Sequence, residues 1–219
     1  METSTSRIQR HLEQLAQYTA TPGQGTTRMS YSEQDKQARQ YLKQQMVALG
    51  LQVREDAIGN IYGRLDGQQA DLPAVIMGSH FDSVPHGGAF DGPAGIVTGL
   101  DVVARISEQN LTPKYPLEVI ALVEEEGTSF GRGLMASSVI TGLIGTKELY
   151  QLMDRQGVSA AQRMAEAGFN ADHASQAVLD PKKVKAFLEL HIEQGPVLEQ
   201  ANEDIGIVEN YRRYQSVRD

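Results

Sequence analysis

Three strand-like runs constrain the fold of this 219-residue chain more than any other feature. They lie at residues 74–77, 117–123 and 184–192, and helical patterns or glycine-rich loops separate them. The first of them, at residues 74–77, is continuously apolar, which is typical of a strand that is covered on both faces. Because strands that alternate with helices build layered α/β folds, we expect a mostly parallel sheet sandwiched by helices.

Apolar residues at helical spacing predict the helices around this sheet. Ile8 and Leu12 belong to the inner face of a first helix, and a second helix begins near Ser32 and ends at Gly50. A third helix begins near Pro93, after the first of the three runs. The remaining expected elements are strands at 51–55, 60–65 and 205–208 and helical segments at 147–153 and 160–167.

Composition excludes several classes of partner and of functional site. The chain has 20 basic and 28 acidic residues and a net charge of -8, so it repels phosphate backbones and we expect no nucleic-acid partner. It has no cysteine, which excludes disulfides, thiolate zinc sites and cysteine nucleophiles. The N-terminal residues are polar and no apolar run is long enough to cross a bilayer. We therefore expect a cytoplasmic protein with no membrane partner.

Residues of the types that bind metal ions stand where the three runs end. His80 follows the first run, and Asp82 stands two positions later. Glu125 and Glu126 follow the second run, and His191 lies near the end of the third. The carboxyl ends of parallel strands meet at one edge of a sheet, where sites form in open α/β folds. Imidazole nitrogens and carboxylate oxygens without a thiolate are suited to zinc, manganese or cobalt.

Asp91 is a further candidate ligand, in the glycine-rich run at 87–95. A carboxylate can bridge two metal ions, and such a pair suits the hydrolysis of an amide. A simpler reading makes Asp91 the N-cap of the helix that begins near Pro93. A phosphate-binding loop is a weaker reading, because the run lacks the lysine of that motif and places an aspartate where the anion would lie.

Other candidates also have simpler readings. The acidic run at 124–126 could be a solvated loop, although it directly follows a buried strand, where ionised groups need a reason to lie. A single histidine such as His80 or His191 is more often a structural residue than a ligand. We assign structural roles to the three remaining histidines, which are His11, His86 and His173.

Three segments resemble a known family: GSHFDSVPHGGAFDGPAG at 78–95, VEEEGTSFG at 123–131 and LELHIEQGPVLE at 188–199. Together they resemble the hydantoinase/carbamoylase branch of the di-zinc aminoacylase and carboxypeptidase-like family. This branch includes N-carbamoyl-L-amino acid hydrolases, ureidopropionases and allantoate amidohydrolases. The resemblance covers residues 26–208 and implies a zinc-exopeptidase-like catalytic domain.

The resemblance also implies two divalent metal ions, with zinc expected and manganese, cobalt or nickel as alternatives. His80 and His191 would bind the first metal. Asp91 would bridge both metals, and Glu126 would bind the second. Glu125 would be the general base that takes a proton from water and later delivers it to the leaving nitrogen.

Two further roles follow from the resemblance. Asp82 would hold the imidazole of His80 in its ligating orientation. Gln194 would contact the carbamoyl or ureido group of a small-molecule substrate. The implied reaction is hydrolysis of a linear amide next to that group, with release of ammonia and, for carbamoyl compounds, of carbon dioxide.

Members of this family are nearly twice as long as the chain. Their additional parts are a lid domain that forms a homodimer interface, a lid arginine that grips the substrate carboxylate, and the last histidine ligand of the second metal. We therefore expect residues 1–208 to be the N-terminal part of the catalytic domain, with an incomplete second metal site and little turnover. Residues 209–219 would be an aberrant or truncated tail.

Two alternatives to an amidohydrolase of this branch remain open from the sequence. The chain could be a non-catalytic remnant or a subunit that needs a partner chain to complete its site. It could also be a metallopeptidase or deacylase of the wider family, although the HIEQG string argues against this reading.

Overall fold

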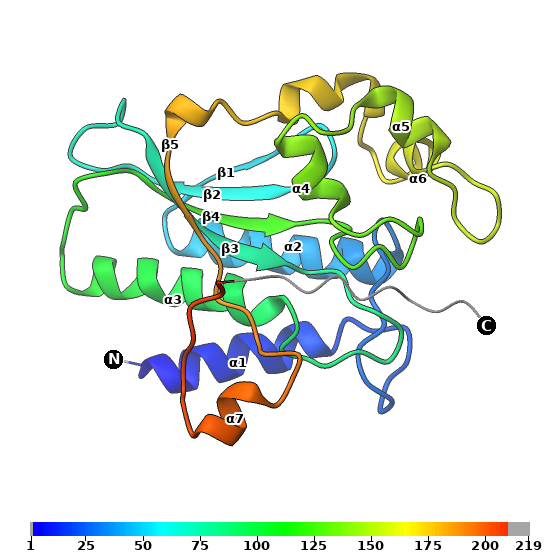
Figure 1. Ribbon diagram of the computed structural model, residues 1–219. Helices are drawn as coiled ribbons and strands as arrows, with labels where there is room; N and C mark the ends of the chain where they lie inside the picture. Colours follow the sequence, from blue (N-terminus) through cyan, green and yellow to red (C-terminus); the bar gives the residue numbers. More distant parts are fainter. Residues whose placement is uncertain (1, 210–219) are drawn as a thin grey trace.

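A five-stranded sheet lies at the centre of the computed structural model, which describes residues 2–209 (Figure 1). The strands follow the order β1-β2-β4-β3-β5 across the sheet. Their bounds are Gln52–Glu55 for β1, Ile61–Leu65 for β2, Ala74–His80 for β3, Leu117–Leu122 for β4 and Val184–Leu188 for β5. All five lie where the sequence pattern predicts a strand.

The sheet is mixed. β3 pairs in parallel with β4 and with β5, whereas β1 with β2 and β2 with β4 are antiparallel pairs. The α/β fold is confirmed, but parallel pairing is limited to the half of the sheet that contains β3. The reason is the short connection at 56–60, which permits a hairpin, whereas a parallel pairing needs a crossover of about a dozen residues or more.

The three long helices are α1 Ser4–Ala16, α2 Glu33–Ala48 and α3 Pro93–Glu108. α2 and α3 cover one face of the sheet, and α1 packs on α3. Glycines permit this close approach: a Cβ on Gly99 of α3 would lie 3.1 Å from the side chain of Met77, and one on Gly63 of β2 would lie 2.9 Å from that of Met46 on α2. No helix in the described part of the chain is long and apolar enough to span a membrane.

Short elements gather on the other side of the sheet (Figure 1). They are α4 Met135–Ile140, α5 Thr146–Gln151, α6 Ala160–Glu166 and the 3-10 helices η1 Ala171–Ala177 and η2 Pro181–Lys183. Charged side chains occupy this face, and Arg64 donates to Glu118 at 3.0 Å. Together with residues 176–180 they line a cavity of about 530 Å³. Helices therefore flank both faces, but the second face is covered less completely.

The predicted strand at 184–192 is shorter in the structure. β5 ends at Leu188, which pairs with Met77, although β3 itself continues to His80. The following residues leave the sheet and pass close to the start of α3, where a glycine leaves room for the carbonyl oxygen of Leu190. His191 therefore lies beyond the strand that the sequence pattern predicts to carry it.

The predicted strand at 205–208 is wrong. No strand of the described residues lies beside this segment to pair with its backbone groups, and Ile207 is 93% exposed. A short helix, α7 (Val197–Ala201), precedes it where the sequence pattern predicts none. The expected tail at 209–219 lies outside the described residues except for its first residue.

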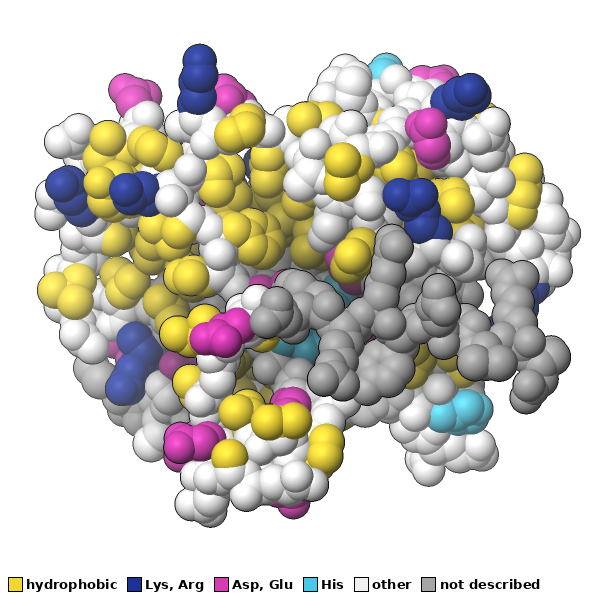
Figure 2. Space-filling model, viewed as in Figure 1, with side chains coloured by type: hydrophobic (Ala, Val, Ile, Leu, Met, Phe, Trp, Pro, Cys, Tyr) yellow, Lys and Arg dark blue, Asp and Glu magenta, His cyan; other side chains and the backbone are white. Residues whose placement is uncertain are grey.

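Hydrophobic side chains are exposed along β5 and the segment that follows it (Figure 2). β5 is an edge strand, so its outer backbone groups have no partner strand within residues 2–209. The exposed hydrophobic residues are Phe187, Leu188, Leu190, Ile192 and Val197. This edge departs from the polar surface expected of an isolated domain.

His11 is a histidine with a structural role. It lies on α1, is only 3% exposed, and its Nδ1 lies 2.7 Å from the hydroxyl group of Tyr41 on α2. Burial, with a smaller effect from the Arg10 cation, lowers the pKa of His11 to about 4. His11 is therefore neutral at pH 7 and joins two helices, in agreement with the structural role assigned from the sequence.

We expect the fold to lose stability through His11 as the pH falls. Between pH 6.5 and pH 4 the unfolded chain binds a proton at His11 that the folded chain excludes, so the free energy of unfolding decreases. Between pH 6.5 and 5.5 the loss is on the order of 1 kcal/mol, and His11→Gln should remove it. Urea unfolding at several pH values measures the difference, with the exposed His173→Gln as control. An identical pH dependence in His11→Gln and the wild type would contradict this expectation.

Candidate metal centre

His80 is the last residue of β3, at the carboxyl edge of the sheet. The buried Arg28 holds the chain just beyond it, because its guanidinium group donates to the carbonyl oxygens of Phe81 at 2.5 Å and Leu15 at 2.8 Å. The Nδ1 atom of His80 lies 3.0 Å from the carbonyl oxygen of Asp82. This contact orients the imidazole ring and leaves its Nε2 for other partners.

Asp91 enters the site from the loop between β3 and α3. The N-cap of α3 is Gly92 and no side chain caps the helix, so the reading of Asp91 as an N-cap is wrong. Gly92 has a φ of 84°, and a Cβ at this position would collide with the backbone and ring of His80. Only glycine permits this approach, which brings the carboxylate of Asp91 beside the imidazole of His80.

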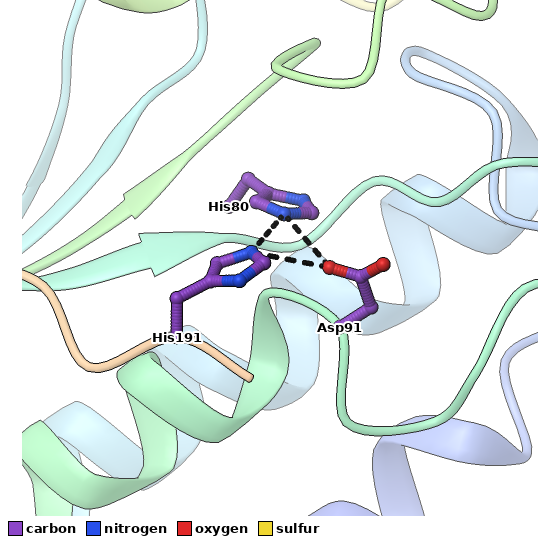
Figure 3. A group of neighbouring side chains, drawn as sticks. All are labelled: His80, Asp91 and His191. Carbon is purple, nitrogen blue, oxygen red and sulfur yellow. Dashed lines mark hydrogen bonds and ion pairs between the residues drawn. The ribbon is translucent and has the colours of Figure 1, made fainter. Parts of the chain in front are cut away.

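Three side chains from distant parts of the chain converge at this point (Figure 3). The Nε2 atom of His80 lies 3.3 Å from Nε2 of His191 and 3.6 Å from Oδ1 of Asp91. The Nε2 atom of His191 lies 3.1 Å from the same carboxylate oxygen. One ligand atom from each residue lies within 4.8 Å of the others. These are the three residues that the sequence resemblance assigns to the first metal.

The three side chains fit a metal ion. Oδ1 of Asp91 is buried and accepts no hydrogen bond from the described residues, which is costly for a carboxylate unless a cation faces it. Burial lowers the pKa of His80, but the carboxylates of Asp82 and Asp91, each 3.6 Å from a ring nitrogen, outweigh this effect and raise it to about 11. The surroundings therefore favour a positive charge, and two imidazoles with one carboxylate are a typical ligand set for zinc.

Asp82 joins the ends of β3 and β4. Its carboxylate accepts the N–H groups of Glu125 and Glu126, each at 3.1 Å. The same carboxylate lies 3.6 Å from Nδ1 of His80. Both the carbonyl oxygen and the carboxylate of Asp82 therefore face His80. Asp82 also positions the two glutamates, a role that the sequence pattern does not indicate.

The acidic run at 124–126 is not a solvated loop. Glu124 is fully buried, and its Oε1 accepts the N–H groups of Ser129 at 3.0 Å and Phe130 at 3.2 Å. Its φ of 54° turns the chain sharply after β4. The chain therefore makes a sharp turn that is closed by hydrogen bonds to the carboxylate of Glu124. These bonds explain why an ionisable group can follow a buried strand.

Both carboxylate oxygens of Glu125 are held by one residue. Oε1 accepts the N–H group of Ser137 and Oε2 accepts its hydroxyl group, each at 2.7 Å. Burial raises the pKa of Glu125 to about 7, although the hydrogen bonds from Ser137 oppose this effect. A carboxyl group that titrates near neutral pH can accept and return a proton, as a general base requires.

Glu126 and Gln194 complete the predicted set. Glu126 lies outside the group of three; burial raises its pKa, and the charges of His80 and Asp91 are near enough to affect it. Gln194 is exposed and donates to Oδ2 of Asp91 at 2.6 Å. Gln194, the expected substrate contact, therefore donates to the carboxylate of Asp91, the expected ligand of both metals.

Ser137 is the site residue that the sequence analysis misses. It lies in α4, a helix that the sequence pattern does not predict, and twelve positions separate it from Glu125. Its only sequence signal is that serine is common in the first turn of helices, where it can bond to nearby groups. That signal does not relate it to a carboxylate in another segment.

Comparisons with known proteins agree with this site. Residues 76–216 match the model of Peptidase family M20/M25/M40. The chain is 43% identical over 202 residues to the N-carbamoyl-L-amino-acid amidohydrolase of Paenarthrobacter aurescens, covering 92% of this chain and 49% of that protein. It is 36% identical over 207 residues to the allantoate amidohydrolase of Bacillus subtilis, covering 93% of this chain and 50% of that protein.

One solved structure is also similar over nearly the whole chain. The hydantoinase/carbamoylase family amidase from Burkholderia ambifaria superimposes with a TM-score of 0.83 and 32% identity, over 91% of this chain and 48% of that one. The chain thus spans about half the length of the relatives that it matches. The resemblance to the hydantoinase/carbamoylase branch is confirmed, and the matched region of the family model contains every ligand of the candidate centre. The chain belongs to peptidase family M20/M25/M40.

Proposed function

We propose that this chain carries the metal-binding and general-base part of a hydrolase that cleaves linear amide bonds next to a carbamoyl or ureido group. The observation that supports this most is the buried Oδ1 of Asp91, which accepts no hydrogen bond from residues 2–209 and lies beside the imidazoles of His80 and His191. The names of the relatives support the substrate class, because they are amidohydrolases of N-carbamoyl-L-amino acids and of allantoate.

In this proposal His80, His191 and Asp91 would hold the first metal. Asp91 and Glu126 would be the protein ligands of the second. Zinc is the expected ion, and manganese, cobalt or nickel could replace it. When bound, such ions lower the pKa of water and polarise the scissile carbonyl group.

The residues of the chain then handle the protons and the substrate. Glu125 takes a proton from water and delivers it to the leaving nitrogen. Asp82 holds His80 and the backbone of the glutamates in place. Gln194 exchanges its contact with Asp91 for one with the carbamoyl or ureido group of the substrate. For a carbamoyl amino acid and water, the products are the amino acid, ammonia and carbon dioxide.

Within the described residues the second metal has only the carboxylates of Asp91 and Glu126. We therefore propose that this chain alone binds the second ion weakly and turns over substrate slowly. A subunit that needs a partner chain is the second candidate, and the exposed hydrophobic edge at β5 favours it over a remnant without function. For both candidate functions, the lack of cysteine supports a cytoplasmic location.

We expect the purified chain to retain about one zinc ion per molecule, because one complete set of three ligands is present. His80→Ala and Asp91→Ala should each abolish this retention. Metal analysis after incubation with zinc and gel filtration measures it.

His173→Ala is the matched control, since that histidine is exposed and is not part of the candidate group, and it should leave the zinc content unchanged. Retention of zinc by both ligand variants, or its absence from folded wild-type chain, would contradict the assignment. Two tightly held ions would mean that a further group completes the second site.

We expect Glu125→Gln to keep its zinc and to lose the remaining turnover. Hydrolysis of an N-carbamoyl-L-amino acid should fall by roughly 10²–10⁴-fold, because glutamine cannot accept the proton of water. Ammonia release measures the rate, with the relative from Paenarthrobacter aurescens assayed under the same conditions. Equal rates for Glu125→Gln and the wild type would refute the role of the base. A wild-type rate equal to that of the relative would refute the incomplete second site.

A further inference from the structure

The carboxylate of Glu125 is held at both oxygens by Ser137, the third residue of α4. The backbone N–H group of Ser137 donates to Oε1 and its hydroxyl group donates to Oε2, each at 2.7 Å. A carboxylate that accepts a bond at only one oxygen can still rotate its plane. One bond to each oxygen restricts both its position and its orientation.

The backbone contact has a structural explanation. The first N–H groups of a helix have no partner within the helix, and at the N-cap of α4, Leu134, the described residues supply no side-chain cap. The N–H group of Leu134 donates to the carbonyl oxygen of Glu125 at 2.8 Å. The N–H group of Ser137 also donates to Glu125, so two bonds join this glutamate to the start of α4. A carboxylate at this position stabilises the start of a helix.

The hydroxyl contact needs a different explanation. Any residue at position 137 except proline would supply the N–H group, so the start of α4 does not require a serine there. A hydroxyl group at this position comes only from serine, threonine or tyrosine, and that of Ser137 bonds to no described side chain other than Glu125. Its effect falls on the second carboxylate oxygen alone.

We propose that Ser137 is a positioning residue, whose hydroxyl group fixes the carboxylate of Glu125 in the orientation that meets the attacking water. This proposal rests on the proposed role of Glu125 as general base. Ser137 keeps its own proton throughout: the proton of water passes to Glu125 and then to the leaving nitrogen. Without the hydroxyl group, Glu125 remains bound through Oε1 but samples other orientations.

Kinetics provide the first test, with the zinc-loaded chain and an N-carbamoyl-L-amino acid. Ser137→Ala should lower kcat about tenfold and leave KM within about twofold, as expected for a hydrogen bond that acts on the base and not on the substrate. Ser137→Thr should restore most of kcat. Ser138→Ala is the matched control, because this buried neighbour makes no side-chain bond to Glu125 and should not change kcat. An unchanged kcat in Ser137→Ala overturns the proposal.

A second readout does not depend on turnover. NMR relaxation of the Glu125 side-chain methylene groups should show increased motion in Ser137→Ala, but not in Ser137→Thr or Ser138→Ala. Circular dichroism checks that all variants keep the fold. If the wild type shows no turnover with any carbamoyl or ureido substrate, the proposed function has failed, and the relaxation data alone decide whether Ser137 positions Glu125. Unchanged motion in Ser137→Ala then overturns the positioning role.

Discussion

The carboxylate of Asp82 connects two strand ends that would otherwise place their side chains independently. It accepts the backbone N–H groups of Glu125 and Glu126 after β4 and lies beside His80 at the end of β3. Asp82 is only 2% exposed, so these charge-assisted bonds form away from water, where they are strongest. The proposed metal ligand His80 and the proposed general base Glu125 therefore share one anchor, and their separation does not depend on either loop alone.

Two residues in unusual backbone conformations complete this arrangement. Gly92 allows the Asp91 loop to pass against His80, and Glu124 adopts a left-handed conformation that turns the chain after β4. Such conformations have a free-energy cost for a residue other than glycine, and Glu124 offsets it with the hydrogen bonds to its buried carboxylate. The loops of the site are thus defined by backbone geometry as much as by side-chain chemistry.

The sequence predicts the parts of the centre that depend on strand ends. His80 ends β3 and the glutamates closely follow β4, so the apolar runs and the residue types at their ends are enough to find them. It could not predict that the pairing of β5 with β3 stops at Leu188, because the length of a ladder depends on register between segments far apart in the sequence. It also could not relate Ser137 to Glu125, since their contact comes from a short helix without a periodic signal. The β1–β2 hairpin was predictable from the short connection at 56–60, but its effect on the sheet depends on pairing with β4.

The position of His191 gives an ion at this centre a mechanical role. His80 belongs to a buried strand, whereas His191 lies 111 residues further along the chain, on an exposed segment beyond an edge strand. An ion held by both would act as a cross-link that closes a long loop, and restricting the unfolded chain in this way favours the folded one. Affinity for the ion and attachment of the segment after β5 would then be two measures of the same free energy. The centre would then hold the segment after β5 against the end of β3, at an exposed edge of the sheet.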